Sequence, residues 1–82
     1  MSDYRRFICY FDKDTELLVD KFSFEIDINL LREIFIPYQN DENYLYMCYE
    51  IGFKEALEIN KIIDVDFNFE KYDYYMEVWS FE

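Results

Sequence analysis

The spacing of apolar and polar residues predicts two β-strands at the start of the chain. Residues 4–12 are rich in aromatic and β-branched side chains, and residues 17–26 alternate between apolar and polar positions. The polar residues 13–16 between them suit a hairpin turn. One face of the second strand would carry Leu18, Phe22, Phe24 and Ile26, interrupted by Asp20. We therefore expect an antiparallel hairpin.

Two more strands are predicted in the second half of the chain. The third covers residues 44–51, and Gly52 ends it; its apolar face would consist of Leu45, Met47, Tyr49 and Ile51. The fourth covers residues 72–81, with Tyr72, Tyr74, Met76 and Val78 on one face and Asp73, Tyr75, Glu77 and Trp79 on the other. Residues 64–70 alternate acidic and apolar residues. They are expected to form either a short extended segment or a loop packed through Val65, Phe67 and Phe69.

Two segments have the spacing of helices. The segment Asp27-Ile28-Asn29 supplies an N-cap before residues 30–35, and Pro37 should stop this short helix. Its apolar stripe is Leu30, Leu31 and Ile34, with Phe35 as a candidate fourth member. The polar residues 39–43 then form a loop. Residues 53–63 have the spacing of a helix, with the mainly apolar positions Phe53, Ala56, Leu57, Asn60 and Ile63 three or four apart and Ile59 beside them. Glu58 and Lys61 lie three apart on the wet side and can pair.

The order of these elements predicts an α+β fold of β-β-α-β-α-β order, with a mainly antiparallel sheet and both helices on one face. The length of 82 residues supports one small domain, residues 1–82. Hydrophobic residues make up 52% of the chain, which is enough for a packed core. Gly and Pro occur once each, so no flexible linker is expected.

Strong negative charge accompanies this apolar content. The net charge is −11, and aromatic residues make up 23% of the chain. Residues 1–40 contain eight acids and five bases, a net of −3, whereas residues 41–82 contain eleven acids and three bases, a net of −8. A small domain needs a net charge of only about 2–8 for solubility, so the excess indicates a basic partner. Direct binding to nucleic acid or to an anionic membrane is disfavoured by the same charge.

Several kinds of chemistry are disfavoured by composition. The chain has no His, so a nucleophile activated by His is impossible, and a single Gly cannot build a phosphate-binding loop. Neither a zinc site nor an EF-hand has its ligand pattern here. We expect no enzyme, no metal and no cofactor. Cys9 and Cys48 are expected to be free and buried.

The location of the protein is also an expectation. The pair Arg5-Arg6 is followed by an apolar run that ends at Asp12 without a small-residue cleavage site, unlike a signal peptide. No stretch approaches the ~18 apolar residues of a membrane span. We expect a cytoplasmic protein that is a monomer or a weak dimer when alone.

Tyrosine near acidic residues marks the candidate binding site. The residues Phe7, Phe11, Phe22, Phe24, Phe53 and Phe67 are most simply assigned to the core. Tyr buries its ring while its hydroxyl stays in water, and it is enriched at interface hot spots. The first candidate set is Asp64, Asp66, Glu70, Tyr72, Asp73, Tyr74 and Glu77. A second candidate patch is Asp41, Glu42, Tyr44 and Tyr46.

Two short segments resemble a known family. Residues 10–16, Tyr-Phe-Asp-Lys-Asp-Thr-Glu, resemble the Trp-Phe-Asp-Lys-x-Thr-Glu segment in the first hairpin of cloacin-type immunity proteins. Residues 68–75, Asn-Phe-Glu-Lys-Tyr-Asp-Tyr-Tyr, are similar to that family's Asp-Ile-Ser-Lys-Phe-Asp-Tyr-Phe. The cloacin-type middle region is richer in Gly, and the chain is also similar to the broader group of immunity proteins of bacteriocin and contact-dependent inhibition systems.

This resemblance implies an antitoxin that neutralises a basic nuclease toxin of the producing cell or its kin. Composition alone implies only an acidic protein-binding domain. One alternative is a phage-type nucleic-acid mimic, such as an anti-CRISPR-like inhibitor, with carboxylates in rows at phosphate-like intervals. Another is a small regulatory or assembly subunit that uses an uncovered strand edge or an apolar patch.

Overall fold

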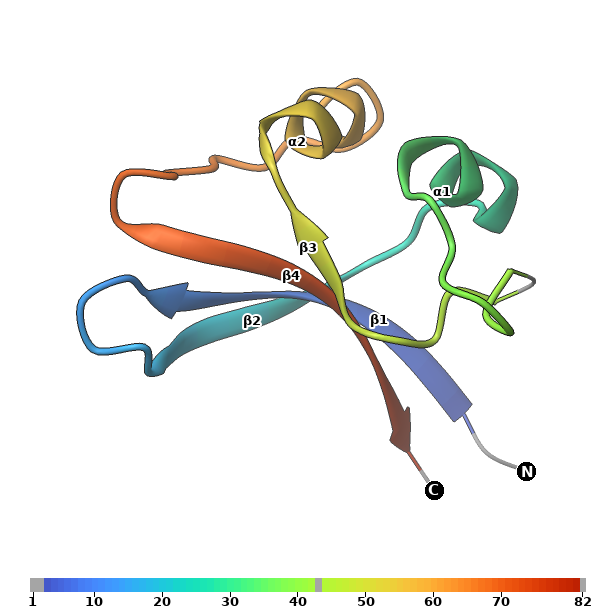
Figure 1. The fold of residues 1–82 in the computed structure, drawn as a ribbon, viewed down its shortest axis with the longest axis horizontal. Helices are drawn as coiled ribbons and strands as arrows, with labels where there is room; N and C mark the ends of the chain where they lie inside the picture. The colour runs from blue at the N-terminus through green and yellow to red at the C-terminus, as the bar shows by residue number, and fades with distance from the viewer. Residues whose placement is uncertain (1–2, 43, 82) are drawn as a thin grey trace.

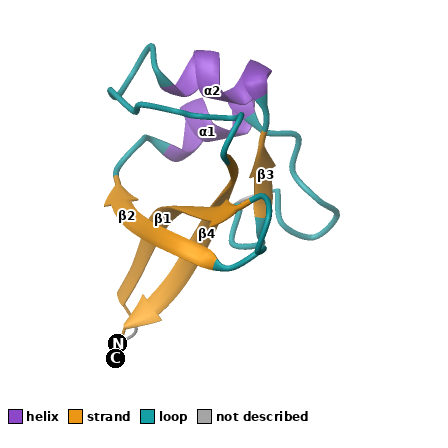
Figure 2. Ribbon diagram, turned by 90° about the vertical axis from the view of Figure 1, so that its left-hand side faces the viewer, coloured by secondary structure: helices purple, strands orange, loops and turns teal. Residues whose placement is uncertain are grey.

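A four-stranded antiparallel sheet carries two short helices on one face (Figures 1 and 2). The computed structural model describes residues 3–42 and 44–81. The elements are β1 (Asp3–Asp12), β2 (Leu18–Phe24), α1 (Ile28–Ile34), β3 (Tyr49–Ile51), α2 (Phe53–Ile59) and β4 (Tyr72–Phe81), and the strand order is β2-β1-β4-β3. The predicted α+β fold of β-β-α-β-α-β order is therefore confirmed.

The longest pairing joins β1 to β4, the two central strands. It runs without interruption from the pair Asp3 and Phe81 to the pair Asp12 and Tyr72. Because side chains alternate along a strand, both strands present one face to the helices and one face away from them. We call the face without helices the open face. This alternation decides where each candidate site residue lies.

The hairpin of β1 and β2 forms as predicted, with one irregularity. The Asp12 carboxylate accepts hydrogen bonds from the backbone N–H groups of Asp14 (2.8 Å) and Thr15 (3.0 Å), which fix the turn. These bonds lower the pKa of Asp12. The register then shifts, so that Tyr10 opposes Asp20 whereas Phe11 opposes Leu18. This bulge places Leu18 opposite Phe11, which corrects the prediction that Leu18 shares a face with Phe22.

The first helix begins as predicted and has a different buried stripe. The Asp27 carboxylate accepts a hydrogen bond from Asn29 N–H (2.8 Å), as an N-cap does. The helix ends when Phe35 turns to an extended conformation (φ −109°, ψ 138°) before Pro37. Leu31 and Phe35 are buried, but Leu30 is exposed, contrary to its predicted place in the stripe.

The third strand is much shorter than predicted. Residues 44–51 were expected to be a strand, but only Tyr49–Ile51 pairs with β4. Upstream, the Asp41 carboxylate accepts the backbone N–H groups of Tyr46 (2.8 Å) and Met47 (3.0 Å). Leu45 adopts a positive φ of 54°, which no strand allows. Backbone groups that a ladder would use are therefore taken by a side chain.

The second helix is also shorter than predicted. It was expected over residues 53–63, but it ends at Ile59, and tighter hydrogen bonds follow from Lys61 N–H to Glu58 and from Ile62 N–H to Ile59. The Asn60 side chain accepts Val65 N–H (2.9 Å), which turns the chain away. Glu58 and Lys61 form the predicted ion pair (3.0 Å).

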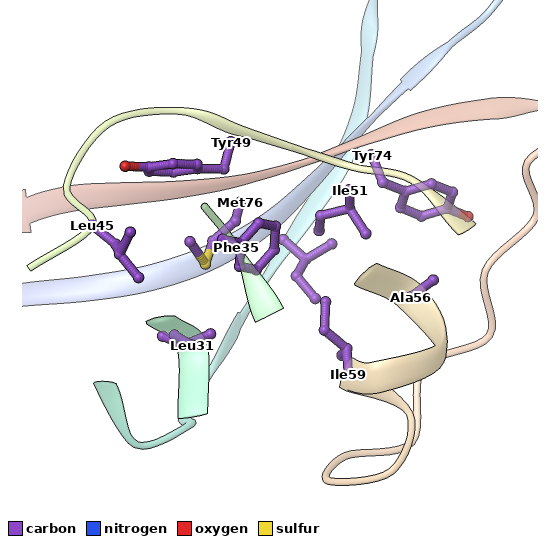
Figure 3. Packing of buried hydrophobic residues seen from close by; sticks show 10 residues of the cluster. Leu31, Phe35, Leu45, Tyr49, Ile51, Ala56, Ile59, Tyr74 and Met76 are labelled. Atoms are coloured by element: carbon purple, nitrogen blue, oxygen red, sulfur yellow. The ribbon is translucent and has the colours of Figure 1, made fainter. Parts of the chain in front are cut away.

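The core lies between the helices and the sheet. Its fully buried side chains include Ile8, Leu31, Leu45, Ile51, Ile59 and Met76. Figure 3 shows several of these side chains, with Phe35, grouped between the helices and the strands. Residues 64–70 form a loop, the second of the two predicted alternatives, and Val65, Phe67 and Phe69 pack against this core.

Several phenylalanines lie outside the predicted core. Phe53 is 74% exposed at the start of α2, where its ring packs against Phe69 (4.8 Å between centroids). Phe22 faces the helix side and is still 37% exposed. Phe7 and Phe11 lie on the open face and are half-buried. Phe22 stays near solvent because the seven-residue helices are too short to cover the whole sheet, whereas Phe7 and Phe11 lie on the face that carries no helix.

Candidate functional site

The alternation of β4 divides the first candidate set over both faces of the sheet. Tyr72 and Tyr74 share the face of Met76, which packs under the helices. Asp73 and Glu77 lie on the open face, opposite Phe11 and Phe7. The prediction placed acids and tyrosines of this strand in one region, but they cannot contact a partner together from the same face.

Four members of the set do come together around one pocket. The loop of residues 64–70, called here the 64–70 segment, runs from α2 to the start of β4 (Figure 1). Between this segment and the sheet lies a pocket of about 430 Å³, called here the aromatic pocket. Asp64, Asp66, Tyr72 and Tyr74 line it, together with Tyr10 of β1 and Phe22 of β2. Glu70 is exposed in the turn just before β4.

The rings of the aromatic pocket support one another. Tyr10 packs edge-on to Tyr72 (5.0 Å between centroids, 65°) and lies nearly parallel to Tyr74 (5.5 Å, 28°). The Tyr74 hydroxyl accepts a hydrogen bond from Asn68 N–H (2.8 Å), which ties the 64–70 segment to the sheet. Burial raises the pKa of Tyr74, and the charge of Asp66 adds to this rise. The pocket walls are therefore held by contacts from three elements and lie in a negative field.

The carboxylates of the 64–70 segment have no partner within the fold. Among the side chains that the structure describes there are two ion pairs, Lys13 with Asp73 (3.2 Å) and Lys61 with Glu58. Asp64, Asp66 and Glu70 are exposed, and no hydrogen bond or ion pair involves their carboxylates. Their charge does not stabilise the fold and faces solvent.

The second candidate patch has a buried centre. Residues 38–42 and 44–48 belong to the Asp41 loop, in which Asp41 is only 7% exposed. Besides two backbone N–H groups, its carboxylate accepts the hydroxyl hydrogen of Tyr49 (2.6 Å). Burial opposes ionisation of Asp41, but the hydrogen bonds from Tyr49, Met47 and Tyr46 outweigh it and lower the pKa. Asp41 therefore organises this loop and is not available to a partner, contrary to its place in the candidate patch.

The exposed part of the second patch is a stack of tyrosines. Tyr44 and Tyr46 stack on each other (5.1 Å, 15°), and Tyr4 of β1 stacks on Tyr46 (5.1 Å, 18°). The Arg6 guanidinium donates to the Tyr44 carbonyl. Tyr4 was not among the predicted residues, because its contact with Tyr46 joins positions far apart in the sequence. At about 3.3 Å per residue, Tyr4 lies roughly 20 Å along β1 from Tyr10, so this stack and the aromatic pocket are separate.

A family model for a domain of unknown function (DUF7683) matches residues 5–77. The chain belongs to the DUF7683 family. The matched range includes both helices, the 64–70 segment and every residue that lines the aromatic pocket. No curated protein and no solved structure matches the chain.

The open face of this DUF7683 domain carries a row of rings that belongs to neither candidate set. Trp79, 40% exposed, packs edge-on to Phe7 (6.2 Å), and the Lys21 ammonium lies 3.2 Å from the centroid of the Trp79 ring. Phe11 packs edge-on to Tyr75 (5.7 Å). The alternation of β1 and β4 predicts that these side chains share a face, but not that the face lacks a cover.

Both cysteines of the DUF7683 domain are free, as predicted, but only Cys9 is buried. Burial and the nearby Glu77 carboxylate raise the pKa of Cys9 to about 11. Cys48 is exposed as a residue, and its thiol lies 4.0 Å from the Glu77 carboxylate. Partial burial of the thiol raises the pKa of Cys48, and the negative charge of Glu77 raises it further. Both thiols stay protonated near neutral pH and are poor nucleophiles.

Two further observations concern the described residues of the DUF7683 domain alone. They contain no group of three or more Cys, Asp or Glu side chains placed to hold a metal ion. Neither helix in this part of the chain has the length and apolar content needed to cross a membrane.

Proposed function

We propose that this chain is a cytoplasmic immunity protein that binds and neutralises a basic nuclease toxin. The observation that carries the proposal is the set of exposed carboxylates without partners at the edge of the aromatic pocket, Asp64 and Asp66. A nuclease must hold a polyanion, so its substrate-binding surface is basic. An acidic protein with aromatic anchors complements that surface.

Binding would begin with long-range attraction. The net charge of −11 steers a basic domain toward the inhibitor, and such association reaches about 10⁸ M⁻¹s⁻¹ at low salt. Rings at the pocket then lose water on contact and slow release, since aromatic anchors dominate most interfaces. Asp64, Asp66, Glu70 and Tyr72 would carry this contact. Asp73 is held by Lys13, and Tyr74 is buried, so their part is to position the others.

The two segments that resemble immunity proteins lie side by side in the fold. Lys13 N–H donates to the Lys71 carbonyl (3.0 Å), and the Lys13 ammonium pairs with Asp73. Tyr10 and Tyr72, one from each segment, pack together in the aromatic pocket. The resemblance therefore falls on one corner of the fold, and that corner borders the proposed binding site.

The proposal is tested by co-expression with a candidate basic nuclease domain. We expect the intact chain to restore growth and to form a stable complex with the purified nuclease domain. The variant Asp64→Lys/Asp66→Lys should lose rescue, whereas Glu25→Lys/Glu33→Lys, which reverses two exposed acids elsewhere, should keep it. Rescue that is equal for both variants would contradict the proposed site.

One observation favours a second function, that of an assembly subunit. Phe53 and Leu57, one helical turn apart on α2, are 74% and 66% exposed, and neighbouring exposed apolar side chains are typical of protein-interaction sites. Sedimentation of the isolated chain separates the two functions. An immunity protein should sediment as a monomer at micromolar concentration, and a stable oligomer would favour the assembly subunit.

A further inference from the structure

The aromatic pocket differs in charge from two other pockets formed by the described residues. A larger pocket beside the ends of β1 and β2 combines Arg5 and Arg6 with Glu25 and Asp27. A groove between the helices combines Glu33 and Glu58 with Lys61. The aromatic pocket has two carboxylates, Asp64 and Asp66, and no basic side chain. No side chain in the lining of the aromatic pocket therefore neutralises these two carboxylates.

Four aromatic rings and the aliphatic side chain of Val65 form its apolar walls. Tyr10 and Tyr72 form a fixed corner (5.0 Å between centroids), and Phe22 of the edge strand β2 completes the lining on the other side. Phe22 pairs with Ile8 and therefore lies on the face of the sheet that carries the helices, but its ring is still 37% exposed. A half-exposed ring on an inward face, next to unpaired carboxylates, provides an open stacking surface in a negative field.

Aromatic faces and carboxylates together recognise a cation. The negative face of a ring attracts a cation over it, and the attraction grows when water is excluded. The guanidinium group of arginine stacks flat on rings and donates several N–H groups to carboxylates at the same time. A lysine ammonium is a compact and strongly hydrated charge that uses such a flat surface less well.

We propose that the aromatic pocket binds an arginine side chain of the partner protein, with the guanidinium against Tyr10, Tyr72 and Phe22 and its N–H groups donating to Asp64 and Asp66. The volume of about 430 Å³ lies in the usual range of ligand pockets, about 300–1,000 Å³, and leaves room for the aliphatic stem. This inference rests on the proposed function, because that function supplies the basic partner.

The test uses the intact chain and small probes without any toxin. N-acetyl-L-arginine amide is titrated while the ring proton resonances of Tyr10, Tyr72 and Phe22 are followed by NMR. N-acetyl-L-citrulline amide, of the same shape without charge, and N-acetyl-L-lysine amide are the controls. We expect the arginine probe to shift these rings at millimolar concentration, the lysine probe to bind more weakly, and the citrulline probe to leave them unchanged.

Two variants locate the probe. Phe22→Leu should weaken the arginine probe about two- to fivefold, the value of one cation–π contact. Asp64→Asn/Asp66→Asn should weaken it further, whereas the matched Glu25→Gln/Glu33→Gln should not. The carboxylate variants alter only exposed side chains, so they still decide the matter if Phe22→Leu does not fold.

Several results would overturn the arginine site: no shift at these rings, equal shifts with citrulline, tighter binding of lysine, or shifts centred on another surface. Failure here is distinguishable from failure of the proposed function. A chain that neutralises the toxin but ignores the probe keeps its function and loses this pocket. A chain that binds the probe and rescues no cell keeps the pocket and loses the immunity function.

Discussion

The Asp41 loop and the 64–70 segment both place carboxylates next to tyrosines, but those carboxylates have opposite surroundings. Asp41 is buried and accepts hydrogen bonds from Tyr46, Met47 and Tyr49. Asp64 and Asp66 are exposed and accept none. The same pairing of residue types therefore stabilises the fold in one region and leaves charge free for a partner in the other.

Removing the charge of Asp41 should have the largest effect on stability. Asp41→Asn keeps the shape but loses a charged acceptor of three hydrogen bonds, and bonds to charged groups contribute about 1.5–3 kcal/mol each. We expect the free energy of unfolding in urea to fall by about 3 kcal/mol. Asp64→Asn/Asp66→Asn should change it by less than about 0.5 kcal/mol. A loss below about 1 kcal/mol for Asp41→Asn would remove the contrast between the two regions.

Acid should erase the contribution of Asp41. Its pKa is lower in the folded chain than in the unfolded chain, so the unfolded state takes up a proton first as the pH falls. The stability that Asp41 adds is fully present above its ordinary pKa of about 4 and disappears as the pH falls through the folded value. The difference in unfolding free energy between the natural chain and Asp41→Asn, measured by urea titrations, should be constant from pH 8 to 6 and shrink toward pH 3. A constant difference down to pH 3 would contradict a charged acceptor.

A smaller effect on stability is expected where residues 10–16 and residues 68–75, the two segments that resemble immunity proteins, meet. The Lys13–Asp73 pair is about half exposed on both sides, with side-chain exposures of 42% and 47%, and such pairs contribute about 0.2–1 kcal/mol. A double-mutant cycle of Lys13→Ala and Asp73→Ala should give a coupling energy in that range that falls with added salt. A coupling energy above about 2 kcal/mol would mean that Asp73, like Asp41, is a carboxylate that stabilises the fold.

Much of the fold could be predicted because its signals are local. Aromatic and β-branched content predicted β1, alternation predicted β2 and β4, and the N-cap segment that begins at Asp27 predicted the start of α1. The third strand was predicted too long because the Asp41 carboxylate accepts hydrogen bonds from the backbone N–H groups of Tyr46 and Met47, five and six residues away. The second helix was predicted too long because the Asn60 side chain accepts a hydrogen bond from Val65 N–H, which turns the chain after Ile59. Neither competing bond has a periodic signature.

The candidate site could be predicted only in part. Local charge counting found Asp64 and Asp66, which the structure places beside Tyr72 and Tyr74. Tyr10 and Phe22 could not be found in this way, since they reach the pocket through the pairing of β1 with its neighbours. The burial of Asp41 was missed because it depends on Tyr49, eight residues away. Burial is a property of tertiary packing, and composition does not reveal it.

The most direct test is the association rate constant with a candidate basic nuclease domain that the chain neutralises in cells, measured by stopped flow at low ionic strength. Asp64→Lys/Asp66→Lys and the control Glu25→Lys/Glu33→Lys have the same net charge and differ only in where the charge is reversed. We expect the first to associate at least about tenfold more slowly than the natural chain, and the control to change the rate by less than about threefold. Added salt should lower the rate of the natural chain. Equal slowing by both variants, or a rate that salt does not affect, would contradict capture of the partner by the 64–70 segment.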